Sequence, residues 1–380
     1  MATVASTVVA CLPVFLLGGL AVLVQEDLSF GPVGLGLAVT TFFAVAAVAS
    51  VPAGRTAARF GSARTMALAG ALSAAALVGM ALAPSYPALL IALGLAGAAN
   101  AMAQISGNQA LAQLVPPRRQ GLAFGFKQSA VPASTLLAGL ALPLLGVTVG
   151  WRATMMAAAL LALVLLGSAR LPPAATRVAG DRPRAGSSRV RVLTLLAVAA
   201  GLGAGAANSL GAFLVASTVA LDWTPASAGL LLSFGSAIGG VMRLTVGWLA
   251  DRRDGGHLLA VAGMLTSGAV ALGLLATGST RLLPVATALA FGLGWSWPGL
   301  LTYAVVRLDP DAPAAATGIT QSGVFLGGAV GPLAFGVIVE GASYQAAWSV
   351  AAGALVAAAL LVCLVCAVLR VPGTSGAEPG

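Results

Sequence analysis

A single lysine lies inside one of the most apolar stretches of this 380-residue sequence. Lys127 is the only lysine in the chain, and the segment around it, GLAFGFKQSAVPASTLLAGLALPLLG, contains no Asp or Glu. A second cation, Arg243, lies in the apolar segment that ends RLTVGWLAD. A desolvated cation with no carboxylate nearby favours binding of an anion that supplies the missing charge. The alternative is that each long side chain extends to a nearby polar surface.

Other polar and aromatic residues lie in similar apolar segments. Asn100, Gln104 and Asn108 recur every four residues, which keeps them within one face of a helix. The remaining candidates for contact with a small ligand are Gln128, Asn208, Trp295, Trp297, Tyr303 and Gln321. The alternative for these residues is hydrogen bonding between helices and ordinary packing. The sequence has no nucleophile beside a base, no phosphate-binding loop and no metal-ligand cluster, so we predict no catalytic residue, no metal, no cofactor and no enzyme activity.

The composition indicates where such a site must be built. The chain is 59% hydrophobic and 8% charged, and its mean hydropathy is +1.00. Soluble domains are about 45–50% apolar and about 25% charged, so this chain is predicted to fold in lipid. The net charge is +9, but in a membrane protein the positions of the basic residues along the chain indicate topology. We therefore expect no nucleic-acid partner.

Windows of about 20 residues, the length that crosses a hydrocarbon core, predict an all-α membrane protein with twelve transmembrane helices. The predicted spans are 5–24, 32–53, 65–83, 87–114, 121–147, 151–169, 192–219, 226–249, 257–277, 282–305, 314–339 and 346–369. No carboxylate falls in the middle of any of these spans.

The arginines predict the orientation of these helices. Alternate loops and the region after the last helix carry 15 of the 19 basic residues, whereas the other loops carry only Arg152 and Arg281. Because cytoplasmic loops are enriched in Lys and Arg, we expect both termini to be cytoplasmic in a multi-pass protein of the plasma (cytoplasmic) membrane.

The two halves of the sequence repeat each other. GRTAARFG at Gly54 corresponds to GWLADRRD at Gly247, and GFKQSAVP at Gly125 corresponds to GITQSGVF at Gly318, both at an offset of 193 residues. A shared offset indicates a duplicated six-helix unit. We therefore predict an N-terminal half at 1–169, a basic cytoplasmic linker at 170–191, a C-terminal half at 192–370 and a tail at 371–380.

These repeated loops resemble those of the major facilitator superfamily. The family pattern is Gly, three residues, Asp, Arg, one residue, Gly, then basic residues; the second copy keeps Gly247, Asp251 and Arg252. The first copy keeps Gly54, Arg59, Gly61 and Arg64 but has Ala58 at the acidic position, and GWR at 150–152 is another family feature. The resemblance implies two pseudo-symmetric six-helix halves, a cavity lined by helices 1, 4, 7 and 10, and a gating role for the seven loop residues of the two copies.

A stripe of small residues suggests close helix packing in the second half. Gly323, Gly327 and Gly331 recur at four-residue spacing before Pro332, which lets another backbone approach. The resemblance also implies a role for Arg243, because some members of the family have a substrate-contacting arginine at the corresponding position. The repeat-related position in the first half is Ser50, so a second arginine of this kind is missing.

We therefore expect a secondary active or facilitative transporter that works by alternating access, for a small organic anion. The alternative is an exporter of a neutral or amphipathic metabolite or drug, suggested by the apolar and aromatic residues of the expected cavity. A membrane receptor or enzyme is a third class that the sequence supports poorly. The expected partners are a small-molecule substrate and membrane lipid, and the chain is expected to be a monomer.

Overall fold

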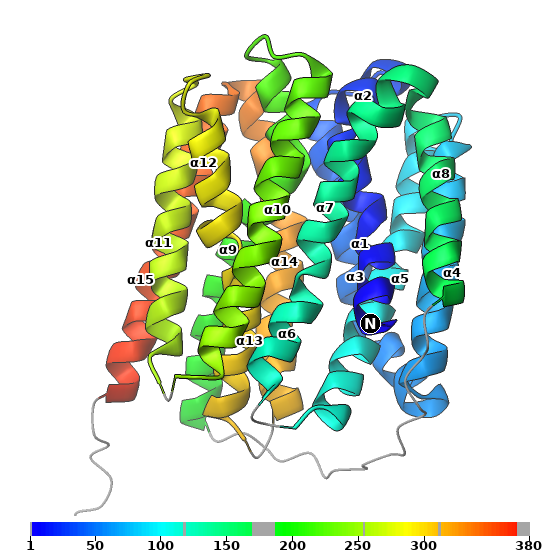
Figure 1. The fold of residues 1–380 in the computed structure, drawn as a ribbon. Coiled ribbons are helices and arrows are strands. Elements are labelled where there is room, and N and C mark those ends of the chain that lie inside the picture. Colours follow the sequence, from blue (N-terminus) through cyan, green and yellow to red (C-terminus); the bar gives the residue numbers. More distant parts are fainter. Residues whose placement is uncertain (1, 117–118, 169–186, 254, 311–312, 371–380) are drawn as a thin grey trace, which may run out of the picture.

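The computed structural model describes residues 2–116, 119–168, 187–253, 255–310 and 313–370, and these residues form helices and short connections without a strand (Figure 1). The first part of the bundle consists of α1 (Ala2–Gly19), α2 (Ala21–Leu28), α3 (Pro32–Phe60), α4 (Ser62–Ala81), α5 (Tyr86–Leu114), α6 (Gln120–Gln128), α7 (Ala130–Ala141), the π-helical η2 (Leu142–Gly146) and α8 (Val147–Ser168). The second part consists of α9 (Ser187–Val219), α10 (Pro225–Ala250), α11 (His257–Ala276), α12 (Leu283–Leu289), the π-helical η3 (Ala290–Gly294), α13 (Trp297–Leu308), α14 (Pro313–Gly341) and α15 (Tyr344–Arg370).

These helices account for twelve membrane spans in the described residues. Ten stretches are long and apolar enough to cross a bilayer, and α1 with α2, bent by 69°, provides another. One of the ten, Gly121–Leu166, is 46 residues long and contains Gly150 at φ 85°, a left-handed conformation that ends one helix and begins the next. The predicted all-α membrane fold with twelve spans is therefore confirmed.

The predicted span limits differ from the structure mainly where the chain is charged. The predicted linker 170–191 lies largely outside the described residues, as does the predicted tail 371–380, but Ser187–Arg191 already belongs to α9. Arginine has a high helix propensity, so the helix continues through Arg189 and Arg191, outside the apolar window from which the span 192–219 is predicted. Helices α12 and α13 share one span with a break at Trp295 and Ser296, a feature that hydropathy does not detect.

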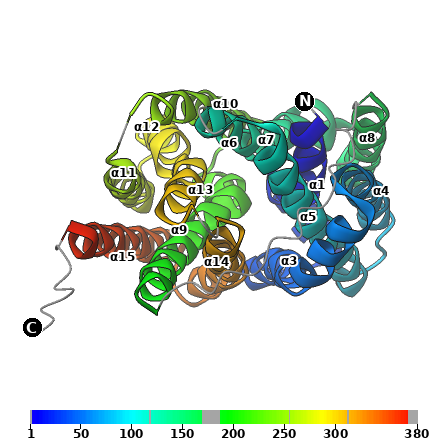
Figure 2. The same ribbon diagram turned by 90° about the horizontal axis from the view of Figure 1, so that it is seen from below.

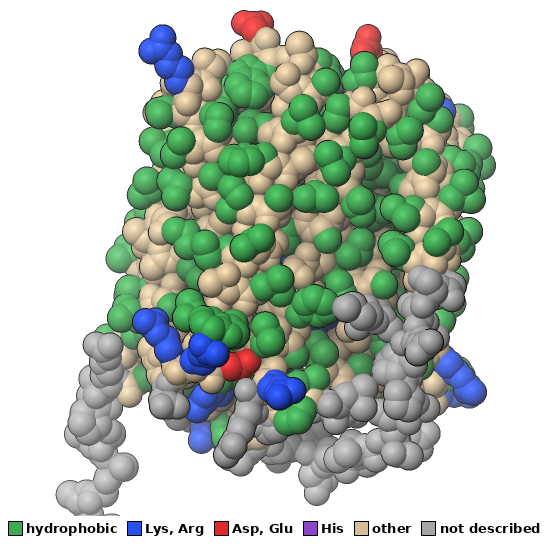
Figure 3. All heavy atoms as spheres, in the orientation of Figure 1, with side chains coloured by type: hydrophobic (Ala, Val, Ile, Leu, Met, Phe, Trp, Pro, Cys, Tyr) green, Lys and Arg blue, Asp and Glu red, His purple; other side chains and the backbone are tan. Residues whose placement is uncertain are grey.

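Charged side chains mark the two ends of the bundle, and hydrophobic side chains cover its middle (Figure 3). We call one end the basic end; its exposed arginines in the described residues are Arg55, Arg59, Arg64, Arg119, Arg189, Arg191, Arg252, Arg253 and Arg307. The opposite end carries exposed Glu26, Asp27, Asp222 and Glu340.

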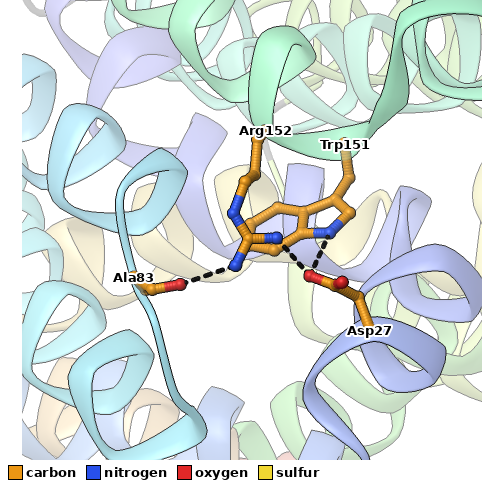
Figure 4. A network of polar contacts seen from close by, with 4 residues as sticks. All are labelled: Asp27, Ala83, Trp151 and Arg152. Carbon is orange, nitrogen blue, oxygen red and sulfur yellow. Dashed lines mark hydrogen bonds and ion pairs between the residues drawn. The ribbon is translucent and has the colours of Figure 1, made fainter.

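The bent first span is held at the opposite end by a polar network (Figure 4). Asp27 of α2 accepts hydrogen bonds from Trp151 Nε1, at 3.1 Å, and from the Arg152 guanidinium. Arg152 also donates to the Ala83 carbonyl at 2.8 Å and stacks over the Trp151 ring, 4.2 Å from its centroid. The GWR segment at the start of the sixth span thus ties α2 to the α4–α5 turn.

The first six and last six spans contact each other at both ends of the bundle. Toward the opposite end, Gly18 of α1 lies against Gly211 of α9, and Thr40 of α3 donates to the carbonyl of Ala329, near the middle of α14, at 2.5 Å. The Val33 amide also donates to Glu340 Oε1 at 2.8 Å. At the basic end, α6 packs against α10 and α13. A central space is therefore bounded by two separate sets of contacts.

The small stripe of α14 packs against a matching stripe on α9. Gly323, Gly327 and Gly331 lie against Ala197, Gly201 and Gly205, with backbone touching backbone at each step. Pro332 faces the other way, and its carbonyl lies against Gly36 of α3. Close approach of this kind maximises dispersion contact between helices in lipid.

Replacing Gly327 by leucine should therefore destabilise the protein. A Cβ at this position overlaps the Gly201 carbonyl, and because that neighbour is backbone it can move only with its helix. We expect the melting temperature to fall by about 5 °C or more. The matched control is Gly353→Leu on α15, where a Cβ meets nothing within 4 Å. Equal melting temperatures for the two variants would contradict this packing.

Candidate functional site

A cavity of about 90 Å³ lies between the first six and last six spans. Its lining includes eight residues predicted from the sequence as ligand contacts: Asn100, Gln104, Gln128, Asn208, Arg243, Trp295, Trp297 and Gln321. The repeat-related glutamines Gln128 and Gln321 thus meet at one cavity. Three other predicted contacts, Lys127, Asn108 and Tyr303, are not part of the lining.

Lys127 lies behind the cavity wall. Its side chain is 1% exposed, so it does not extend to the membrane surface. Its Nζ donates to Gln104 Oε1 at 2.6 Å and to Asn108 Oδ1 at 2.7 Å, with the Gln104 carbonyl at 3.5 Å. The ammonium is thus solvated by two amides of α5, and none of its acceptors is ionised. Gln104 belongs both to this cluster and to the cavity lining.

Arg243 occupies a gap between two helix ends. It is 3% exposed, and its Nε and Nη2 donate to the Trp295 carbonyl at 3.2 and 2.6 Å. Its Nη1 donates to the Gln128 carbonyl. Gln128 ends α6 and Trp295 follows η3, and carbonyls at helix C-termini carry partial negative charge. Arg243 therefore joins the fifth span to the broken tenth span, as non-helical backbone at membrane depth requires.

These contacts leave part of Arg243 available. A guanidinium has five N–H donors, and the hydrogen bonds to protein in the described residues use three of them. Arg243 lines the cavity, so its positive charge lies at the cavity wall. The ring of Trp295 lies 5.7 Å from the guanidinium carbon.

Aromatic side chains form much of the cavity wall. Besides Trp295 and Trp297, the wall contains four residues that the sequence analysis did not single out: Phe15, Phe42, Phe43 and Phe325. Phenylalanine in an apolar span has no signal that separates a cavity wall from a lipid-facing surface. Cys11, also in the wall, bonds Asn100 Oδ1 at 3.6 Å. The Trp297 Nε1–H finds no acceptor in the described residues.

The other amide and the tyrosine make local contacts. Asn208 donates to the Ala204 carbonyl of its own helix at 2.8 Å. The Tyr303 hydroxyl accepts a hydrogen bond from Arg307 at 2.9 Å, and its ring packs edge-on against His257. Tyr303 thus lies between the cavity and the basic end, next to Arg307 and His257.

The two repeated loops at the basic end differ in what they contact. Asp251, at the end of α10, accepts hydrogen bonds from the backbone amides of Gly121 and Leu122, both at 2.8 Å. These amides are free donors of the first turn of α6, and a carboxylate is favoured there. Gly247 lets the helices approach, because its Cα lies against Gly121 and Gly125. Arg252 stacks over Trp248 at 3.7 Å.

The first loop makes no comparable bridge within the described residues. Arg59 stacks over its neighbour Phe60 at 5.2 Å, and Arg64 is exposed. Gly61 turns the chain between α3 and α4 at φ 82°, and a Cβ at Gly54 would meet nothing within 4 Å. With Ala58 in place of an acid, the link across the basic end is made by Asp251.

Replacing Asp251 by alanine should loosen the first turn of α6. The turn loses a charged cap contributing about 1–2 kcal/mol, so we expect hydrogen exchange of the Gly121 and Leu122 amides to accelerate about tenfold. Exchange measured by mass spectrometry over residues 121–125 tests this. Glu26→Ala, at the opposite end, is the control. Unchanged exchange in Asp251→Ala would show that the carboxylate does not hold the turn.

The sequence as a whole matches one family. The family model of the major facilitator superfamily matches residues 3–255 and again 193–380. The chain belongs to the major facilitator superfamily. A search of curated proteins finds no match.

Solved structures of the superfamily share its architecture. The chain is similar to a bacterial homologue of the human lysosomal transporter Spinster, with 16% identity and a TM-score of 0.68, covering 96% of this chain and 94% of that one. It is also similar to the human organic anion transporter MFSD10 (TETRAN), with 16% identity and a TM-score of 0.69, covering 95% of this chain and 98% of that one. At this identity the similarity establishes the transporter fold, and the site must be interpreted from its own residues.

Proposed function

We propose that this superfamily member is a secondary active or facilitative transporter of a small organic anion, which binds in the central cavity beside Arg243. The observation that carries the proposal is the charge of the membrane interior. Two buried cations, Lys127 and Arg243, lie at or behind the cavity, whereas the acidic residues in the described part of the chain lie at the ends of the bundle. An anion entering the cavity would supply the missing negative charge.

Polar groups around the cavity suit an anionic head group. Arg243 has donors to spare, and its planar guanidinium matches a carboxylate or phosphate. Gln104 accepts a hydrogen bond from Lys127 through Oε1, so its two Nε2–H donors remain for a ligand in the cavity. The charge of Lys127 polarises this amide and strengthens those donors. Gln128 and Gln321 add further amide donors.

Alternating access follows from the two sets of contacts that bound the cavity. In our proposal the α1–α9 and α3–α14 contacts close the opposite end, and the Asp251 bridge and its neighbours close the basic end. Each set would break in turn as the halves rock around the site. The distribution of arginines supports a plasma-membrane orientation with the basic end and both termini in the cytoplasm.

The aromatic wall favours one alternative substrate, a neutral or amphipathic metabolite or drug. Phe15, Phe42, Phe43 and Phe325 offer stacking and apolar area and no charge. Such a compound would bind without using the donors of Arg243.

A pair of matched ligands separates the two substrates. Purified protein would be screened for thermal stabilisation by aromatic and aliphatic carboxylic acids, each compared with its primary amide, which has nearly the same shape and no charge. We expect at least one acid to raise the melting temperature while its amide has no effect. Stabilisation by amides as large as that by the acids would contradict an anion transporter and favour the alternative.

A further inference from the structure

A long groove separate from the central cavity lies on the outer face of the bundle. It has a volume of about 740 Å³ and is lined by α9, α14 and α15, which lie together on the side away from α10 and α7 (Figure 2). Side chains on its rim are well exposed, with Leu326 at 65%, Val330 at 57% and Val350 at 57%. Because these residues belong to membrane spans, the groove opens toward lipid.

The groove can recognise apolar ligands only. Its three hydroxyl side chains are Thr194, Ser209 and Ser322, and each donates to a carbonyl of its own helix at 2.7–2.8 Å. Its other lining residues are glycine and apolar side chains. The groove therefore offers no free hydrogen-bond donor, and a polar group of a ligand buried there would lose its hydrogen bonds to water without replacement.

The groove is long enough to hold a lipid chain. On α14 its lining runs from Ser322 to Ile338, which is about 24 Å at a rise of about 1.5 Å per residue. This is most of a hydrocarbon core of about 30 Å, and it exceeds the depth of one leaflet.

One arginine lies at the end of the groove nearest the basic end. Arg191 is exposed, one turn before the lining residue Thr194 and two turns before the lining residue Val198. Positions separated by seven residues share a helix face, so Arg191 continues the groove-lining stripe of α9 beyond the apolar zone. An arginine at this depth attracts the phosphate of an anionic lipid.

We propose that this groove binds an acyl chain of an anionic membrane lipid from the leaflet at the basic end, with the phosphate of the head group at Arg191. This inference is independent of the substrate in the central cavity. The lipid would cover the outer face of the α9–α14 pair, where Gly201, Gly205, Gly327 and Gly331 bring the two helices together.

Native mass spectrometry of the purified full chain, titrated with phosphatidylglycerol or phosphatidylcholine, tests the proposal. We expect the wild-type protein to bind the first phosphatidylglycerol about fivefold more tightly than phosphatidylcholine, the effect of about one surface arginine. Arg191→Gln should bring the ratio close to one. Ala334→Phe, which fills the groove from an exposed position of α14, should weaken binding of both lipids about tenfold.

Two control variants should behave like the wild-type protein. Val337→Phe adds the same side chain to α14 at an exposed position outside the groove, and Arg55→Gln removes a different arginine of the basic end. Circular dichroism would verify that all variants are folded. Unchanged lipid binding in Ala334→Phe, an unchanged lipid preference in Arg191→Gln, or a dimer mass that Ala334→Phe abolishes would each overturn the proposal.

Discussion

The Arg243→Gln variant is expected to lose anion binding and much of its stability together. Glutamine cannot reach both the Trp295 and Gln128 carbonyls, and it removes the positive charge that contacts the cavity. A buried acceptor left without its partner costs about 1–3 kcal/mol, so we expect a total loss of about 3 kcal/mol. Binding of the best stabilising acid should weaken at least tenfold, measured by calorimetry on the fraction that remains folded.

Two further variants separate the structural role of Arg243 from its role toward a ligand. Arg281→Gln removes an exposed arginine of the opposite end and should leave both stability and binding unchanged. Arg243→Lys keeps the charge without the planar fork, so it should keep more acid affinity than Arg243→Gln does. Equal affinity for the acid in wild-type and Arg243→Gln protein would place the anion elsewhere.

The second large effect is expected where the amides solvate Lys127. The double variant Gln104→Leu with Asn108→Leu removes both amide acceptors and leaves a buried ammonium beside the Gln104 carbonyl at 3.5 Å. An uncompensated buried charge costs about 3–5 kcal/mol, so this variant should be severely destabilised. Adding Lys127→Met, which removes the charge, should restore most of the lost melting temperature.

The control for this cycle is an amide on the same helix that does not contact the lysine. Asn100 lies one turn from Gln104 and bonds Cys11, so the effects of Asn100→Leu and Lys127→Met should add. A triple variant no more stable than the double variant would mean that the amides do not hold the ammonium.

Much of the fold follows from short-range properties of the sequence. The apolar windows and the arginine distribution predict twelve spans. They suffice because a segment that crosses lipid must satisfy its own backbone hydrogen bonds, which leaves the helix as the structure of an isolated apolar span. The repeat offset places Gln128 and Gln321 in corresponding helices, and both lie at the cavity. The packing of Gly323, Gly327 and Gly331 is likewise visible as a spacing, since a small stripe on one helix calls for a close neighbour.

The breaks within spans, and the contacts that form at these breaks, cannot be predicted from apolar windows or residue spacing. Trp295 is predicted as a ligand contact, yet its carbonyl is the group that holds Arg243, across 52 positions of the chain. Asn108 has the spacing of a cavity residue, but about 40° of drift per four residues turns it toward Lys127. Such choices depend on the tertiary position of a neighbouring helix, which one sequence does not encode locally.

Transport in proteoliposomes tests the central claim most directly. Vesicles containing the purified protein and loaded with an excess of the best stabilising acid would be diluted into a trace of the same acid carrying a radioactive label. We predict accumulation of the labelled acid by wild-type protein, no accumulation of its primary amide in the corresponding assay, and no accumulation of the acid by Arg243→Gln protein. Accumulation of the amide at the rate of the acid, or of the acid by the Arg243→Gln protein at the wild-type rate, would contradict an anion site at Arg243.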